Sequence, residues 1–161
     1  FIESNLEKIF NLDMQALQHL AKTNCAIKGS VVEQDEREGG LRANLNFGHT
    51  FGHAVESASG FSLTHGECVA IGMAAAFRMA LYLDMTRGSV LTRVENLLVR
   101  AGLPVKARGI DPEAIYQQMY KDKKIRNNHL LFILPRGAGE VVQKVIEDES
   151  LIRRIIGEIT L

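Results

Sequence analysis

The sequence has few of the features that mark several large classes of protein. Its two cysteines are too few for a disulfide framework. Both Cys25 and Cys68 lie in apolar helical patterns, so we expect them to be buried thiols in a reducing compartment. Lysine plus arginine and aspartate plus glutamate number 19 each, which gives no electrostatic reason to expect a nucleic acid or membrane partner. No uncharged apolar run reaches the roughly 18 residues of a membrane span, and no segment has the pattern of a signal peptide. We therefore expect a cytoplasmic protein.

The remaining composition is that of a globular domain. The chain has 161 residues, of which 46% are hydrophobic, and this length can bury a sizeable core as one domain. It begins at Phe1, without an initiator methionine, in the capping-box pattern Ser4-x-x-Glu7. We therefore expect a domain of a longer polypeptide.

Hydrophobic periodicity and end signals predict a mainly α fold. We expect helices over residues 5–10, 13–35, 46–58, 64–83, 89–100, 111–121 and 149–158. Two β-rich runs, residues 129–135 and 140–146, are joined by Arg136-Gly137-Ala138-Gly139 and predict one small β-hairpin. The expected architecture is a single multi-helix domain over residues 1–161. No glycine-rich phosphate loop follows a strand, so we do not expect a dinucleotide-binding half within it.

Three of the five histidines fall within seventeen positions. His49 and His53 are four residues apart, so they share one face of a helix. His65 follows Thr64 in the capping-box pattern Thr64-His65-Gly66-Glu67, which begins a helix that can fold back on the first. Imidazoles from two neighbouring helices are a common way to build a zinc site. We therefore expect a metal centre that includes His49 and His65, with hydrogen-bonded core histidines as the alternative.

Other residues near these histidines could take part in the chemistry. His53 could bind the metal or transfer protons, because its ordinary pKa lies near neutral pH; a helix–helix hydrogen bond is the alternative. Glu56 and Glu67 could be ligands or could accept hydrogen bonds from imidazole N–H groups, although solvated or capping roles are more common. Glycines cost a helix about 1 kcal/mol each relative to alanine. Four glycines lie in or beside the expected helices that carry the histidines, and close backbone packing or space for a ligand would explain them: Gly48, Gly52, Gly66 and Gly72.

Cationic and amide side chains before and after the histidines predict an anionic substrate. Lys28 lies on the apolar stripe of the expected helix 13–35, where an ammonium needs an anion unless it extends to solvent. Arg42 can bind carboxylate or phosphate through two hydrogen bonds, and Asn46 either assists or caps the histidine segment. A lysine of Lys121-Asp122-Lys123-Lys124 could complete a cationic pocket, although such a run is usually solvated.

These residues occur together in one ordered pattern. It comprises Lys28, Val31-Val32, Asp35-Glu36-x-Glu38, Arg42-x-x-Leu45-Asn46-Phe47-Gly48-His49-Thr50-Phe51-Gly52-His53-Ala54-Val55-Glu56, His65-Gly66-Glu67-x-Val69-Ala70-Ile71-Gly72-Met73 and Asp122-Lys123-Lys124. In this pattern the chain strongly resembles 3-dehydroquinate synthase. The resemblance covers nearly the whole chain and corresponds to the helical, C-terminal half of that enzyme.

The resemblance implies a zinc-dependent (or cobalt-dependent) lyase of the shikimate pathway, which leads to chorismate and the aromatic amino acids. Such an enzyme uses NAD catalytically and converts 3-deoxy-D-arabino-heptulosonate 7-phosphate into 3-dehydroquinate and phosphate. By resemblance, His49 and His65 would bind the metal, and His53 would lie near the substrate as a proton-transfer or hydrogen-bonding group. Substrate-binding roles would fall to Lys28, Arg42, Asn46 and a lysine of the last motif, for which Lys124 is favoured over Lys123.

The resemblance also implies that part of the enzyme is missing from this chain. The N-terminal NAD-binding half would lie elsewhere, together with a glutamate that is the third zinc ligand. We therefore expect the chain alone to bind zinc weakly and to lack synthase activity, and the whole enzyme to be a homodimer.

Three other functions are compatible with parts of the pattern. Another sugar-phosphate cyclase, such as 2-deoxy-scyllo-inosose synthase, would share the zinc histidines and NAD, but the carboxylate-binding candidates Lys28 and Arg42 favour dehydroquinate synthase. A metal-dependent polyol dehydrogenase would have little use for an anion-binding cluster. In a helical interaction module the histidines would only cap helices and pack.

Overall fold

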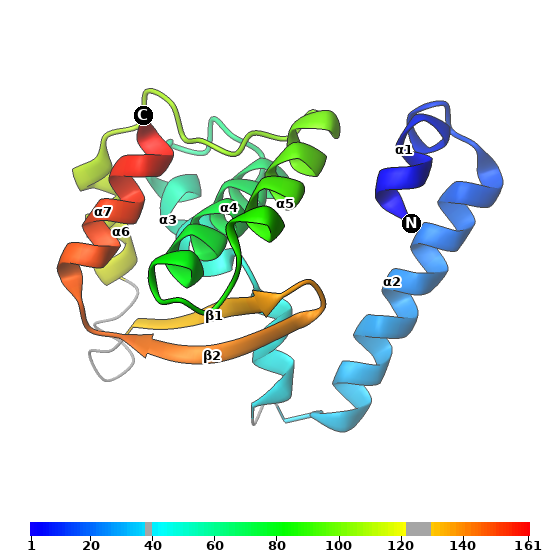
Figure 1. Ribbon diagram of the computed structural model, residues 1–161, viewed down its shortest axis with the longest axis horizontal. Coiled ribbons are helices and arrows are strands. Elements are labelled where there is room, and N and C mark those ends of the chain that lie inside the picture. The colour runs from blue at the N-terminus through cyan, green and yellow to red at the C-terminus, as the bar shows by residue number, and fades with distance from the viewer. Residues whose placement is uncertain (38–39, 122–129) are drawn as a thin grey trace. The chain divides into compact units, whose positions relative to one another are not determined.

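The computed structural model describes residues 1–37, 40–121 and 130–161, which form a mainly helical protein with one β-hairpin (Figure 1). In chain order the elements are α1 Ile2–Phe10, α2 Met14–Gln34, the 3-10 helix η1 Leu41–Asn46, α3 His49–Ala58, α4 His65–Tyr82, α5 Gly88–Arg100, α6 Pro112–Lys121, β1 Leu130–Gly137, β2 Glu140–Ile146 and α7 Glu149–Thr160. This confirms the predicted fold class. The helix η1 was not predicted.

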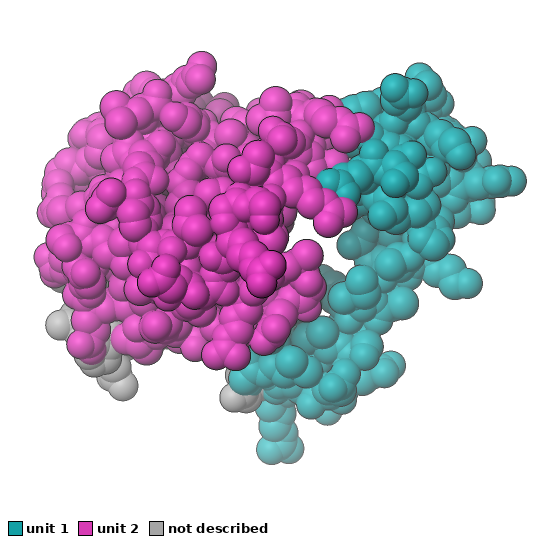
Figure 2. Space-filling view, in the orientation of Figure 1, with its two compact units in different colours: residues 1–45 teal, residues 46–161 magenta. Residues whose placement is uncertain are grey.

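Contacts divide the chain into two compact units, residues Phe1–Leu45 and Asn46–Leu161, which Figure 2 shows in different colours. The first unit contains α1 and α2, and the second contains α3 to α7 with the hairpin. Because contact units need not be separate folding units, the expectation of one domain over residues 1–161 stays a prediction.

In the first unit, most of α2 is exposed to solvent. Asp13 caps this helix as predicted, because its side chain accepts a 2.8 Å hydrogen bond from the amide of Ala16. Ala16 is the one buried residue of α2, whereas Cys25 is exposed and Ile27 is 58% exposed. The prediction that Cys25 is buried is therefore wrong. A periodic apolar stripe is buried only where another element packs against it, and among the described residues α1 packs against α2 while most of α2 remains exposed.

The first helix also starts differently from the prediction. It begins at Ile2, with Phe1 as an N-cap that makes no side-chain cap hydrogen bond. The capping box predicted at Ser4 is therefore wrong. Asn5 has non-helical dihedral angles (φ −126°, ψ 15°), which kink α1 immediately after Ser4.

The second unit contains the hydrophobic core, which surrounds α4. This helix is buried along most of its length and packs against α3, α5, α7 and β1. On α7, four isoleucines with helical spacing are fully buried: Ile152, Ile155, Ile156 and Ile159. Burial of each isoleucine side chain contributes about 1.5–3 kcal/mol to the stability of the fold. No helix in the described parts of the chain is long and apolar enough to cross a membrane.

The predicted hairpin is confirmed. Strands β1 and β2 pair antiparallel, from Leu130 opposite Ile146 to Pro135 opposite Val141. The hydroxyl of Thr50 donates a 3.2 Å hydrogen bond to the carbonyl of Leu131, which links β1 directly to α3. The hairpin therefore supports the helix that carries two of the predicted site residues.

Candidate metal centre

Three glycines allow α3 and α4 to cross with their backbones in contact. A Cβ atom on Gly72 would lie 1.9 Å from the carbonyl oxygen of Gly48, and one on Gly52 would lie 3.0 Å from the carbonyl oxygen of Cys68. Gly48 also has a left-handed conformation (φ +81°) and is the N-cap of α3. Close backbone packing therefore explains these glycines. It does not explain Gly66, where an added Cβ meets no atom within 4 Å.

The predicted capping box fixes the start of α4. The Thr64 hydroxyl accepts a hydrogen bond from the amide of Glu67 (3.4 Å), and the Glu67 carboxylate accepts one from the amide of Thr64 (2.8 Å). The Thr64 hydroxyl also donates to the Glu67 carboxylate (2.7 Å), and this bond, followed by the one from the Thr64 amide, lowers the pKa of Glu67. His65 is therefore the first residue of a capped helix.

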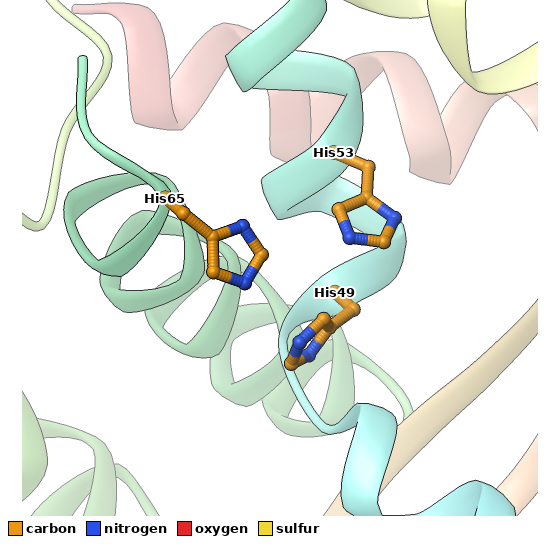
Figure 3. Close-up of side chains that lie close together, drawn as sticks. All are labelled: His49, His53 and His65. Atoms are coloured by element: carbon orange, nitrogen blue, oxygen red, sulfur yellow. The ribbon is translucent and has the colours of Figure 1, made fainter.

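The crossing brings His49, His53 and His65 together. One ligand atom from each ring lies within 4.8 Å of the other two, and the ring centroids are 5.2–5.7 Å apart. Figure 3 shows the three rings around a common space, two from α3 and one from α4. His49 is half-buried, whereas His53 and His65 are exposed.

Hydrogen bonds orient two of the three rings. The Nδ1 atom of His49 lies 3.2 Å from the carbonyl oxygen of Phe47, and that of His65 lies 3.4 Å from Oε2 of Glu56. A carbonyl and a carboxylate can only accept, so Nδ1 is the donor in each bond, and in the neutral imidazole Nε2 is then the nitrogen with a free lone pair. A histidine that binds a metal through one ring nitrogen typically donates a hydrogen bond of this kind from the other. The three imidazoles therefore fit a metal ion by their chemistry. Their ligand atoms lie within 4.8 Å of one another, whereas two ligand atoms on tetrahedral zinc are about 3.4 Å apart.

The other acidic and thiol groups near the rings have different roles. Glu56 is the acceptor for His65, whereas Glu67 belongs to the capping box. Cys68 is fully buried as predicted, and its pKa is raised by burial first and then by the negative charges of Glu56 and Glu67. A buried neutral thiol does not compete with the imidazoles for a metal.

The predicted substrate-binding residues lie mainly in the first unit. Lys28 is exposed on α2. Arg42, half-buried in η1, donates through its guanidinium to the carbonyl of Glu36 (3.2 Å). The carboxylate of Asp35 accepts hydrogen bonds from the amides of Gly40 and Arg42, both 2.8 Å, and so shapes this loop. Asp35 stands at the C-cap of α2 and is not among the site residues predicted from the sequence.

Two further candidates complete the predicted set. Asn46 is exposed at the end of η1, three residues before His49, and does not cap α3, whose N-cap is Gly48. Lys123 and Lys124 lie outside the described residues. The predicted cationic pocket beside the histidines therefore stays a prediction.

Comparison with known proteins assigns the chain to a family. The family model described as "3-dehydroquinate synthase C-terminal" matches residues 1–125. A 3-dehydroquinate synthase of Acetivibrio thermocellus is 54% identical over 99% of this chain, and one of Ruminiclostridium cellulolyticum is 48% identical over 97%. The chain spans 44% of the length of each of these relatives. The chain belongs to the 3-dehydroquinate synthase family and corresponds to its C-terminal domain.

Solved structures of related cyclases share the fold. A 2-epi-5-epi-valiolone synthase from Streptomyces hygroscopicus, with NAD⁺ and Zn²⁺ bound, matches 98% of this chain with a TM-score of 0.77 and 26% identity, over 43% of its own chain. A 2-deoxy-scyllo-inosose synthase, complexed with carbaglucose-6-phosphate, NAD⁺ and Co²⁺, matches 83% with a TM-score of 0.72 and 28% identity, over 39% of its own chain.

Proposed function

We propose that this chain is the metal- and substrate-binding half of a 3-dehydroquinate synthase. The whole enzyme would be a phosphorus–oxygen lyase that converts 3-deoxy-D-arabino-heptulosonate 7-phosphate into 3-dehydroquinate and phosphate. The observation that carries the proposal is the pair His49 and His65, whose ring centroids are 5.4 Å apart and whose Nδ1 atoms each lie against a hydrogen-bond acceptor. The 54% identity to a named synthase supports this substrate over related ones.

Each site residue then has a distinct role. His49 and His65 would hold zinc or cobalt through Nε2. When bound, the metal supplies Lewis-acid polarisation of a substrate hydroxyl, and NAD accepts and returns a hydride. His53 lies beside both proposed ligands and would hold or move a proton at the substrate, because an imidazole can both donate and accept a proton. Lys28, Arg42, Asn46 and Lys124 would bind the carboxylate, phosphate and hydroxyl groups.

The proposed centre needs a further ligand from outside this chain. Catalytic zinc usually takes three protein ligands and one water molecule. A glutamate from the remaining, NAD-binding part of the enzyme would be the third ligand beside His49 and His65. The chain alone would then bind zinc weakly and have no synthase activity, and the whole enzyme would act as a homodimer.

Zinc titration calorimetry tests this proposal. It compares this chain with a joined protein, in which the unmatched part of the Acetivibrio thermocellus relative precedes the chain. We expect tight one-to-one binding only in the joined protein, and its loss in His49→Ala. His19→Ala, a histidine on α2, is the matched control and should leave binding unchanged. The absence of histidine-dependent binding in both proteins would contradict the metal assignment, and turnover by this chain alone would contradict the need for a further ligand.

The second candidate is another sugar-phosphate cyclase, because the similar solved structures are enzymes of that kind. A substrate panel with the joined protein distinguishes the two. Turnover of the heptulosonate phosphate, reduced by Arg42→Ala, supports dehydroquinate synthase. Turnover of a substrate without a carboxylate would support the second candidate.

A further inference from the structure

We propose that Glu56 is a positioning residue that holds the His65 imidazole in the orientation needed to bind a metal through Nε2. The inference rests on the proposed function, because it concerns a side chain in contact with an expected ligand. The two residues are nine positions apart and come from different helices, yet Oε2 of Glu56 lies 3.4 Å from Nδ1 of His65.

A constrained turn places Glu56 beside His65. The backbone carbonyl of Glu56 accepts hydrogen bonds from the Ser59 hydroxyl (2.8 Å) and from the Phe61 amide (3.1 Å). Gly60 and Phe61 both have left-handed conformations, with φ values of 62° and 61°. This conformation costs a non-glycine residue roughly 1–2 kcal/mol. The chain reverses direction at this turn, and His65 at the start of α4 lies against Glu56 near the end of α3.

Glu56 is also the glutamate that is available to His65. The other candidate, Glu67, is already engaged by the amide and the hydroxyl of Thr64, at 2.8 and 2.7 Å. The Glu56 side chain is 20% exposed, compared with 55% for His65. A carboxylate that is partly withdrawn from water attracts an N–H group more strongly than a fully solvated one.

The two expected ligands are therefore held in different ways. His49 is half-buried and donates to an uncharged backbone carbonyl, whereas His65 is exposed and donates to a carboxylate. An exposed imidazole has few packing contacts to fix its rotamer, so His65 depends more on its acceptor. A carboxylate acceptor also keeps the proton on Nδ1 and makes Nε2 a more basic ligand.

Cobalt titration of the joined protein, followed by visible absorption, tests the inference. Glu56→Ala should weaken Co²⁺ binding about 10-fold to 100-fold and change the cobalt absorption bands. Glu56→Gln should weaken it less, because the amide oxygen still accepts but carries no charge. Glu140→Gln, an exposed glutamate of the hairpin, is the control and should match the parent protein. Thermal unfolding without metal shows whether each variant is folded.

The outcomes separate this inference from the proposed function. Parent affinity and spectrum in Glu56→Ala would overturn the inference alone, provided that His49→Ala abolishes binding. If the parent shows no His49-dependent binding, the proposed function fails and the inference falls with it. Should Glu56→Ala unfold, Glu56→Gln decides: lowered affinity in a folded protein supports the inference, and unchanged affinity overturns it.

Discussion

The α3–α4 crossing and helix α2 both carry predicted site residues, but the crossing holds its site residues in place more firmly than α2 does. At the crossing, Gly48 and Gly72 bring the backbones of α3 and α4 into contact, and the capping box at Thr64 fixes the first residue of α4. Together they fix the backbone positions from which the imidazole side chains extend. On α2, Lys28 is an exposed side chain of a helix that is itself mostly exposed. The arrangement of the three imidazoles is therefore set within this chain, whereas the arrangement of the proposed substrate-binding side chains depends on further contacts.

Substitution of one helical glycine in each region should give the largest contrast. Gly72→Ala would place a Cβ 1.9 Å from the Gly48 carbonyl, so α3 and α4 must separate. We expect a loss on the order of 4 kcal/mol in the free energy of unfolding, at the upper end of overpacking effects. Gly29→Ala on α2 meets no atom within 4 Å and should stabilise by up to about 1 kcal/mol. Urea denaturation measures the change in the free energy of unfolding for each variant. Equal changes in the two variants would contradict the difference between the crossing and α2.

Truncation of one isoleucine in each compact unit tests a related difference, in how deeply each unit buries its side chains. Ile155 on α7 is fully buried, so Ile155→Ala should cost about 3 kcal/mol through lost contacts and a cavity. Ile27 on α2 is 58% exposed, so Ile27→Ala should change the stability by less than about 0.5 kcal/mol. A large loss for Ile27→Ala in urea denaturation would show that α2 is covered in solution.

The features that the sequence predicted correctly are those set by local chemistry. The capping box at Thr64 depends on residues three positions apart, and the hairpin depends on two β-rich runs around glycines. Both signals act within a few residues, so neighbouring residues were enough to predict them. The spacing of His49 and His53 likewise needed only the period of a helix.

The features that the sequence did not predict depend on tertiary contacts or on backbone groups. The apolar helical pattern around Cys25 suggested that this side chain is buried, but burial requires a partner element. The acceptor for His49 is the carbonyl of Phe47, which every residue type carries and no sequence pattern reveals. Of Glu56 and Glu67, equal candidates by residue type, only the fold shows that Glu56 faces His65.

Removal of the helix caps should give the smallest effects. Thr64→Ala on α4 and Asp13→Ala on α2 should each cost about 1 kcal/mol. Only Thr64→Ala should also weaken metal binding in the joined protein, because His65 is the first residue of α4. Equal metal affinity in the two variants would show that the α4 cap does not support the centre.

The Thr64 cap should also depend on pH. Its hydrogen bonds lower the folded-state pKa of Glu67 below the ordinary value of 4.5. A carboxylate with a lowered pKa stabilises the folded state above its unfolded-state pKa, and this contribution is lost as the pH falls through the folded-state value. The difference in thermal midpoint between the parent and Glu67→Gln should therefore be largest at neutral pH and shrink below about pH 4.5. A difference that is constant across this range would mean that the Glu67 charge contributes nothing to the cap.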